Sequence, residues 1–146
     1  MGQNEAKLES IIKAAEQACV HQEILSLPHQ YDTLIGERGV TLSGGQKQRI
    51  SIARALIKNP NLVIFDDCLS AVDAKTENEI ISNLYAYLRN KTAIIITHRI
   101  FSMFNFDRIF VLDCGEIIEQ GTHAELIALK GYYAQLYQRQ QEQEES

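Results

Sequence analysis

The chain has 146 residues, of which 45% are hydrophobic and 23% are charged, a balance typical of one soluble globular domain. Its longest apolar runs, near residues 62–65 and 93–96, are far shorter than the roughly 20 residues that cross a bilayer. The net charge of −5 argues against a nucleic-acid or anionic-membrane surface, which is normally basic. Three scattered cysteines without a CxxC pair favour a reducing, cytosolic compartment over a disulfide framework or a zinc site.

The first third of the chain is predicted to be helical. Apolar residues recur at helical spacing from Asn4 to about Leu27, and Pro28 ends this first helix. Residues 29–41 have no helical period and are expected to form a structured loop. A second helix is predicted from about Gln46 to Lys58, before Asn59-Pro60. Its basic residues are interpreted as a solvated face: Lys47, Arg49, Arg54 and Lys58.

The pattern changes after residue 60. Leu62–Phe65 and Thr92–Thr97 are short, continuously apolar runs, which predict parallel strands buried on both faces. Asp73 is a good N-cap for a helix between them that runs to about Arg89.

The last third of the chain is predicted to hold a hairpin and two helices. The hairpin strands are residues 108–112 and 116–119, and the helices are residues 123–129 and 132–140. The alternation of strands and helices predicts an α/β domain over residues 61–146, preceded by a separate α-helical lobe over residues 1–60.

The segment Leu42-Ser43-Gly44-Gly45-Gln46 leads directly into the second helix. Two glycines and a serine at a helix start expose backbone N–H groups and a hydroxyl at the positive end of the helix dipole, an arrangement that binds phosphate. Taken alone, an ordinary glycine turn with a serine cap explains it better. The strand that ends at Asp66-Asp67 shifts the balance, because ligands of parallel α/β sheets bind beyond the carboxyl ends of strands, where an aspartate can hold Mg²⁺ on nucleotide phosphates.

Four motifs in this order resemble those of the nucleotide-binding domain of ATP-binding cassette (ABC) transporters. LSGGQKQRISIARAL resembles the family signature, LVIFDD its Walker B strand, LSAVD its D-loop and ITHR its switch-histidine segment. The resemblance extends from about Ile11 to Gln138, and residues 35–39 resemble the segment by which exporters of this family touch their membrane domains. It implies the exporter branch and an α/β fold: an incomplete P-loop NTPase (RecA-like) parallel sheet with an α-helical signature subdomain.

The resemblance also implies site residues. Two domains of this family clamp two ATP molecules head to tail, so the γ-phosphate held by the partner would face Ser43, Gly44, Gly45 and Gln46. Asp66 would serve Mg²⁺, and Asp67 stands where the family usually has a glutamate that polarises the attacking water. His98 would contact the γ-phosphate as the switch histidine. Asp73 has two interpretations, a contact across the dimer or a plain helix N-cap.

Several family features are missing from this sequence. It contains no G-x-x-x-x-G-K-[ST] run, no upstream aromatic residue that would stack on adenine and no glutamine loop. We therefore expect the C-terminal part of a longer transporter subunit, cut inside the helical lobe and inactive by itself. The intact parent is expected to be an ATPase at the cytoplasmic face of a membrane, where it couples hydrolysis to export. Its expected partners are a second nucleotide-binding domain and the transmembrane domain of the same transporter, with no nucleic acid.

Two other interpretations stay open. Asp67 in place of glutamate resembles subunits of heterodimeric exporters in which one ATP site is degenerate and hydrolyses poorly. The other is a soluble family member that acts on nucleic acid, as DNA-repair and translation ATPases of this superfamily do. The acidic balance and the exporter-like residues 35–39 argue against the second.

Overall fold

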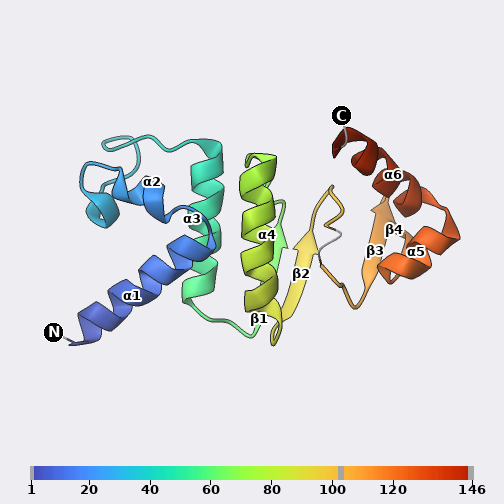
Figure 1. Cartoon of the computed structure of the whole chain (residues 1–146), viewed down its shortest axis with the longest axis horizontal. Helices are drawn as coiled ribbons and strands as arrows, with labels where there is room; N and C mark the ends of the chain where they lie inside the picture. Colours follow the sequence, from blue (N-terminus) through green and yellow to red (C-terminus); the bar gives the residue numbers. More distant parts are fainter. Residues whose placement is uncertain (1, 102–103, 145–146) are drawn as a thin grey trace. The chain divides into compact units, whose positions relative to one another are not determined.

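The computed structural model describes residues 2–101 and 104–144, and Figure 1 shows their helices and strands. The chain folds as two units, the first ending at Ile96 and the second beginning at Thr97. The boundary expected after residue 60, between a helical lobe and a sheet-containing core, stays a prediction. No helix within the described residues is long and apolar enough to span a membrane.

The single helix expected between Asn4 and Leu27 is wrong, because the chain forms α1 (Gly2–Gln17) and α2 (His21–Leu25) instead. Between them Cys19 adopts a left-handed backbone with φ of +54°. The Cys19 N–H donates to the Glu16 carbonyl (3.0 Å) and the Val20 N–H to the Ala15 carbonyl (2.9 Å). This pair of bonds closes a helix C-terminus, usually with glycine at the left-handed position. Because the apolar residues keep their helical spacing across this break, the sequence pattern did not predict it.

The loop expected over residues 29–41 is confirmed, and it contains the short 3₁₀-helix η1 (Gln30–Asp32). An isolated bridge between Ile35 and Val40 closes its second half. A Cβ atom on Gly39 would collide with the Leu34 carbonyl, so this tight closure requires glycine. Helix α3 (Gly44–Ile57) follows the loop, close to the predicted range.

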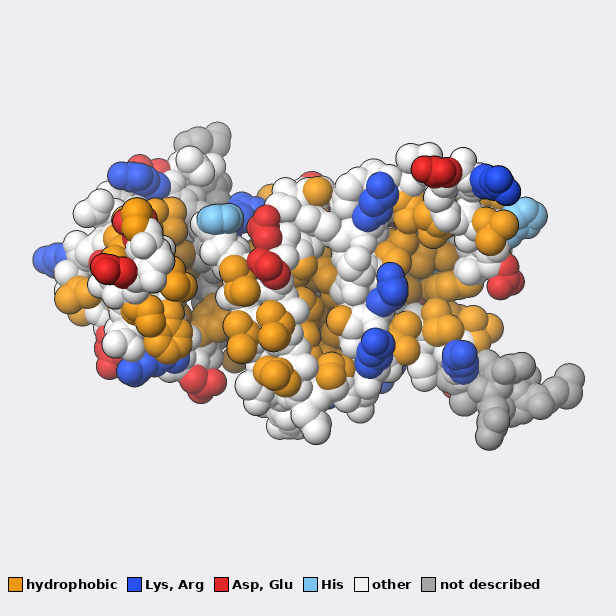
Figure 2. All heavy atoms as spheres, turned by 180° about the vertical axis from the view of Figure 1, so that it is seen from behind, with side chains coloured by type: hydrophobic (Ala, Val, Ile, Leu, Met, Phe, Trp, Pro, Cys, Tyr) orange, Lys and Arg blue, Asp and Glu red, His pale blue; other side chains and the backbone are white. Residues whose placement is uncertain are grey.

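Strands β1 (Leu62–Asp66) and β2 (Thr92–Ile96) pair in parallel, as expected, with Ile64 opposite Ile94. Helix α4 (Ala74–Leu88) connects them. The expected burial of both sheet faces is wrong for this chain. On β1, Val63 and Phe65 are buried on one face, whereas Ile64 on the other face is 58% exposed. Figure 2 shows hydrophobic side chains at the surface over these strands.

The second unit contains the expected hairpin, formed by β3 (Ile109–Asp113) and β4 (Glu116–Gly121). Its two turn residues, Cys114 and Gly115, both have positive φ, which matches the right-handed twist of paired strands. Helices α5 (His123–Leu129) and α6 (Tyr132–Glu144) follow, as expected. A small apolar core joins the elements of this unit through Ile100, Leu126 and Tyr133.

The start of α6 is held by a side chain from the hairpin. The Glu119 carboxylate accepts hydrogen bonds from the backbone N–H groups of Tyr132 (2.6 Å) and Tyr133 (3.0 Å). These N–H groups have no partner inside the helix, and a carboxylate at this end also favours the helix dipole. A Cβ atom on Gly131 would collide with the same carboxylate, so a larger residue there would force the Glu119 side chain to shift.

Candidate functional site

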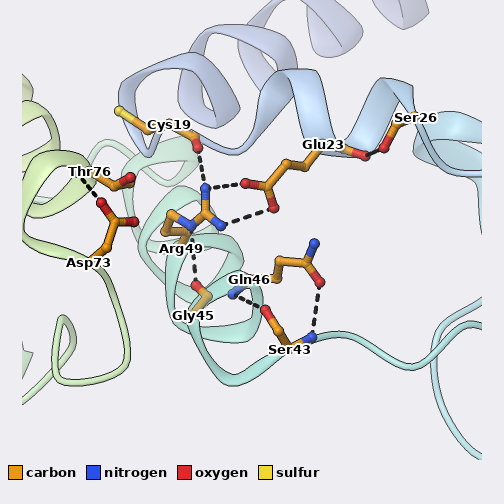
Figure 3. Close-up of polar contacts among 9 residues, drawn as sticks. All are labelled: Cys19, Glu23, Ser26, Ser43, Gly45, Gln46, Arg49, Asp73 and Thr76. Atoms are coloured by element: carbon orange, nitrogen blue, oxygen red, sulfur yellow. Dashed lines mark hydrogen bonds and ion pairs between the residues drawn. The ribbon is translucent and has the colours of Figure 1, made fainter.

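The signature segment begins α3 with two reciprocal hydrogen bonds (Figure 3). The Ser43 hydroxyl accepts the Gln46 N–H (3.2 Å), and the Gln46 side-chain oxygen accepts the Ser43 N–H (2.9 Å). This capping box confirms the serine cap. The hydroxyl acts here as an acceptor, so its own proton is left for a phosphate oxygen. A phosphate role for Ser43, Gly44, Gly45 and Gln46 stays a prediction.

The two glycines of this segment lie against the loop after β1. A Cβ atom on Gly45 would stand 2.8 Å from the Ala71 carbonyl oxygen, and one on Gly44 would stand 3.4 Å from the Ala71 Cβ. Since real Cβ atoms essentially never come within 3.0 Å of another heavy atom, residue 45 must be glycine for the loop to pack here. Gly45 therefore has a packing role in addition to the backbone donors that the sequence suggested.

The solvated face expected along α3 is wrong at Arg49, whose side chain is only 12% exposed. Its guanidinium donates to the carbonyls of Cys19 (2.6 Å) and Gly45 (3.3 Å) and forms an ion pair with Glu23 (2.6 Å) (Figure 3). Arg49 thus ties the turn between α1 and α2 to the first turn of α3. The sequence showed only a basic residue among other basic residues, so charge alone did not reveal it.

Asp66 ends β1, and both Asp66 and Asp67 are exposed. Asp67 has a left-handed backbone with φ of +46°, and its N–H donates to the Ile96 carbonyl of β2 (2.8 Å). Aspartate is among the few residues that adopt this conformation readily, and such backbone geometry concentrates at functional sites. The position therefore suits an aspartate better than a longer side chain.

These two carboxylates fit a magnesium ion that is held mainly by a nucleotide. Mg²⁺ takes one or two carboxylates, several waters and substrate phosphates. Among the residues that the structure describes, no cluster of three or more His, Cys, Asp or Glu side chains could hold a metal by itself. The adjacent carboxylates of Asp66 and Asp67 therefore match a site in which protein and nucleotide phosphates bind the metal together, and not a site made of protein ligands alone.

Asp73 is the N-cap of α4, because its carboxylate accepts the Thr76 N–H (3.0 Å). This hydrogen bond lowers the pKa of the Asp73 carboxyl. The cap interpretation is confirmed, and a contact across a dimer stays a prediction. His98 is an exposed residue in the second unit, just after β2 ends. Its predicted contact with a γ-phosphate remains a prediction.

Comparison with known proteins identifies the family. The family model described as ABC transporter matches residues 2–70. A Bacillus subtilis protein named uncharacterized ABC transporter ATP-binding protein YknU is 48% identical over 95% of this chain. The chain belongs to the ABC transporter family. It spans about a quarter of the length of these ABC relatives, since it covers 24% of YknU and 24% of YheI, a probable multidrug resistance ABC transporter ATP-binding/permease protein of the same organism (49% identical over 96% of this chain).

Other ABC matches carry export in their names. The leukotoxin export ATP-binding protein LtxB of Aggregatibacter actinomycetemcomitans is 49% identical over 91% of this chain, which covers 19% of LtxB. The solved structure of a bacterial Atm1-family ABC exporter with ATP bound matches 90% of the chain with a TM-score of 0.78 and 43% identity, and the chain covers 23% of it. These matches confirm the exporter branch and the expected α/β fold, a part of a P-loop NTPase domain with a helical signature region.

Proposed function

We propose that this chain is part of the ATP-binding subunit of an ABC exporter, in which it contributes the signature segment and the Walker B carboxylates to ATP sites at the cytoplasmic face of a membrane. The observation that carries the proposal is the capped start of α3, where Ser43, Gly44 and Gly45 combine backbone donors with a hydroxyl. A helix N-terminus of this kind favours an anionic phosphate. The family relationship supplies ATP as the ligand.

Each residue has a distinct task in this proposal. The signature residues Ser43, Gly44, Gly45 and Gln46 hold the γ-phosphate of the nucleotide bound to a second nucleotide-binding domain. Asp66 holds Mg²⁺, which neutralises phosphate charge when it is bound. Asp67 accepts a hydrogen bond from the attacking water and orients it, and His98 contacts the γ-phosphate. Asp73 additionally touches the partner domain across the dimer.

The exposed loop before the signature supports a transmembrane partner. Leu34 is 79% exposed and Ile35 is 51% exposed, although both side chains are apolar. Exposed apolar side chains that a closed loop holds in place are suited to contact another protein surface. We propose that this loop contacts the transmembrane domain of the same transporter.

A pair of matched variants tests the function. Ser43→Ala and Thr122→Ala each remove a capping box, at α3 and α5, and each should cost about 1 kcal/mol of helix stability. Only Ser43→Ala also removes a phosphate donor, so it alone should lower the ATPase rate of the exporter that contains this chain, by about tenfold or more. Equal ATPase rates in the two variants would contradict a phosphate role for the signature segment.

A second candidate function is a degenerate, weakly hydrolysing site in a heterodimeric exporter, and the aspartate at position 67, where the family usually has a glutamate, favours it. An aspartate carboxylate stands about 1.5 Å behind that of a glutamate, one carbon–carbon bond. Misplacement of that order costs about 100-fold in rate. If the site is degenerate, Asp67→Glu should raise turnover about ten- to hundredfold with unchanged ATP affinity, measured with the partner's site disabled. Asp32→Glu, at an exposed position of η1, is the matched control. Unchanged or lower turnover removes the support for degeneracy.

The chain by itself is expected neither to bind Mg-ATP tightly nor to hydrolyse it. In this proposal Asp66 and Asp67 serve only the metal and the attacking water, and His98 serves only the terminal phosphate. The sequence has no P-loop lysine for the other phosphates. Isothermal titration calorimetry with Mg-ATP tests this expectation. A dissociation constant in the micromolar range would overturn it.

A further inference from the structure

Gln48 lies on α3 within two turns of its start and joins this helix to the loop after β1. Its Nε2 donates to the Ser70 hydroxyl oxygen (2.8 Å) and, over a longer 3.4 Å, to the Asp67 carbonyl oxygen. Its Oε1 accepts the Ala71 N–H (2.9 Å). The side-chain amide therefore uses its donor and its acceptor on one loop, which lies 19 to 23 positions away in the sequence.

The network around Gln48 is consistent in its donors and acceptors. The Ala71 N–H can only donate, so it fixes the oxygen of the amide toward Ala71 and the nitrogen toward Ser70. The Ser70 hydroxyl donates in turn to the Asp67 carbonyl (3.4 Å), which leaves its oxygen free to accept from Gln48. The carbonyl of Asp67 thus receives both side chains.

A second contact joins the same two segments. The approach of Gly45 to the Ala71 carbonyl, described above, places the first turn of α3 directly on the loop that Gln48 binds. Two contacts on Ala71, one at the Gly45 position and one at Gln48, resist both sliding and rotation of the loop against the helix. The signature end of α3 and residues 67–71 are therefore joined by packing at Gly45 and by the hydrogen bonds of Gln48.

Asp67 is held through its backbone at both ends. Its N–H is bound to β2 through the Ile96 carbonyl, and its carbonyl receives Gln48 and Ser70. With φ at +46°, this backbone has an uncommon left-handed conformation, and the hydrogen bonds at both ends help to hold it. Gln48 is therefore in a position to act on the backbone of Asp67.

We propose that Gln48 is a positioning residue that couples the signature segment to Asp67. This inference rests on the proposed function, in which the signature faces the nucleotide of the partner domain and Asp67 serves the nucleotide of its own domain. Binding of the partner's phosphate at the start of α3 then changes the direction of Asp67 through Gln48. Gln48 itself touches no nucleotide; it acts through the Asp67 backbone.

Two variants separate the parts of this link. Gln48→Met keeps the length of the side chain and removes all three hydrogen bonds, whereas Gln48→Glu keeps an acceptor for the Ala71 N–H and loses the donor to Ser70 and Asp67. Gln135→Met makes the same substitution at an exposed position of α6 and is the control.

Hydrogen exchange of the Ala71 amide in this chain tests the contact itself. Exchange should be about five- to tenfold faster in Gln48→Met, as expected for the loss of one hydrogen bond, and unchanged in Gln48→Glu and Gln135→Met. Unchanged exchange in Gln48→Met would overturn the inference whatever the chain does with ATP.

Steady-state ATPase kinetics of the exporter that contains this chain test the coupling. Gln48→Met and Gln48→Glu should both lower kcat about tenfold, with KM for ATP within about twofold of wild type, because the carboxylate is misplaced while nucleotide contacts remain. If the wild-type exporter does not hydrolyse ATP, the proposed function fails. If it does and Gln48→Met keeps the wild-type kcat, the proposed function stands and this inference alone is overturned.

Discussion

Replacement of Arg49 by methionine should lower the free energy of unfolding of the first unit much more than replacement of an exposed arginine on the same helix. The guanidinium is 12% exposed and donates to two backbone carbonyls, those of Cys19 and Gly45, as well as to Glu23. A hydrogen bond from a charged donor contributes roughly 1.5–3 kcal/mol, and loss of the donor leaves an unpaired carbonyl. The ion pair adds less, about 0.5 kcal/mol, because Glu23 is 40% exposed and water screens it.

The sum of these terms predicts that Arg49→Met lowers the free energy of unfolding by about 3 kcal/mol. With a urea dependence of about 2 kcal/mol per molar, the unfolding midpoint should fall by about 1.5 M. Arg54→Met removes an exposed arginine from the same helix and should change the free energy by less than about 0.5 kcal/mol. Glu23→Gln should cost about 0.5 kcal/mol, since Arg49 keeps both carbonyl contacts.

Urea unfolding followed by far-ultraviolet circular dichroism measures these differences, and amide exchange in α1 and α3 localises them to the first unit. The expected order of destabilisation is Arg49→Met, then Glu23→Gln, then Arg54→Met. If Arg49→Met and Arg54→Met shift the midpoint equally, the guanidinium does not hold the helix turn and the assignment of Arg49 is refuted.

Two further predictions concern thiols and the sheet. Burial raises the pKa of the Cys19 and Cys68 thiols from 9.0 to about 11, whereas Cys114 is exposed. Iodoacetamide at pH 8 should therefore label Cys114 first, and a Cys114→Ser variant should lose the fast phase of labelling. Equal labelling rates at all three cysteines would contradict this prediction. Because the folded chain holds these two thiols protonated, their contribution to stability is complete below pH 9 and is lost as the pH rises toward 11. The exposed apolar face formed by Ile64, Ile94 and Ile96 should cause the chain to self-associate at high concentration. In light scattering, Ile64→Lys should reduce this self-association, whereas Leu129→Lys, at an exposed position of α5, should leave it unchanged. A wild-type chain that is monomeric at high concentration would contradict the prediction.

The sequence was informative where a local pattern has one physical solution. Thr122 with Glu125 and Ser43 with Gln46 have the spacing of a capping box, and Cys114-Gly115 between two apolar runs forms a tight hairpin turn. The motif order was sufficient for the family. Such signals depend on neighbours in the chain, so they can be read without coordinates.

The remaining features depend on contacts between distant residues. The break at Cys19 uses a non-glycine residue in a left-handed conformation, which Asn83 and Arg49 stabilise by donating to the Gln17 and Cys19 carbonyls. The roles of Gln48 and Arg49 likewise arise from segments 19 to 30 positions away. Composition and periodicity contain no information on such pairs, and the sequence therefore suggested a solvated face at Arg49.

The cap on α6 has a consequence for how this part of the chain can vary among related proteins. The Glu119 carboxylate occupies the space that a side chain at position 131 would need, so the two positions are not independent. A residue larger than glycine at 131 would force the flexible end of the Glu119 side chain to shift away from its present position over the Tyr132 and Tyr133 N–H groups. A glutamate at 119 is therefore expected to occur more often with glycine at 131 than with a larger residue. In an alignment of relatives, this would appear as covariation between position 119, on β4, and position 131, just before α6, which are distant in the sequence.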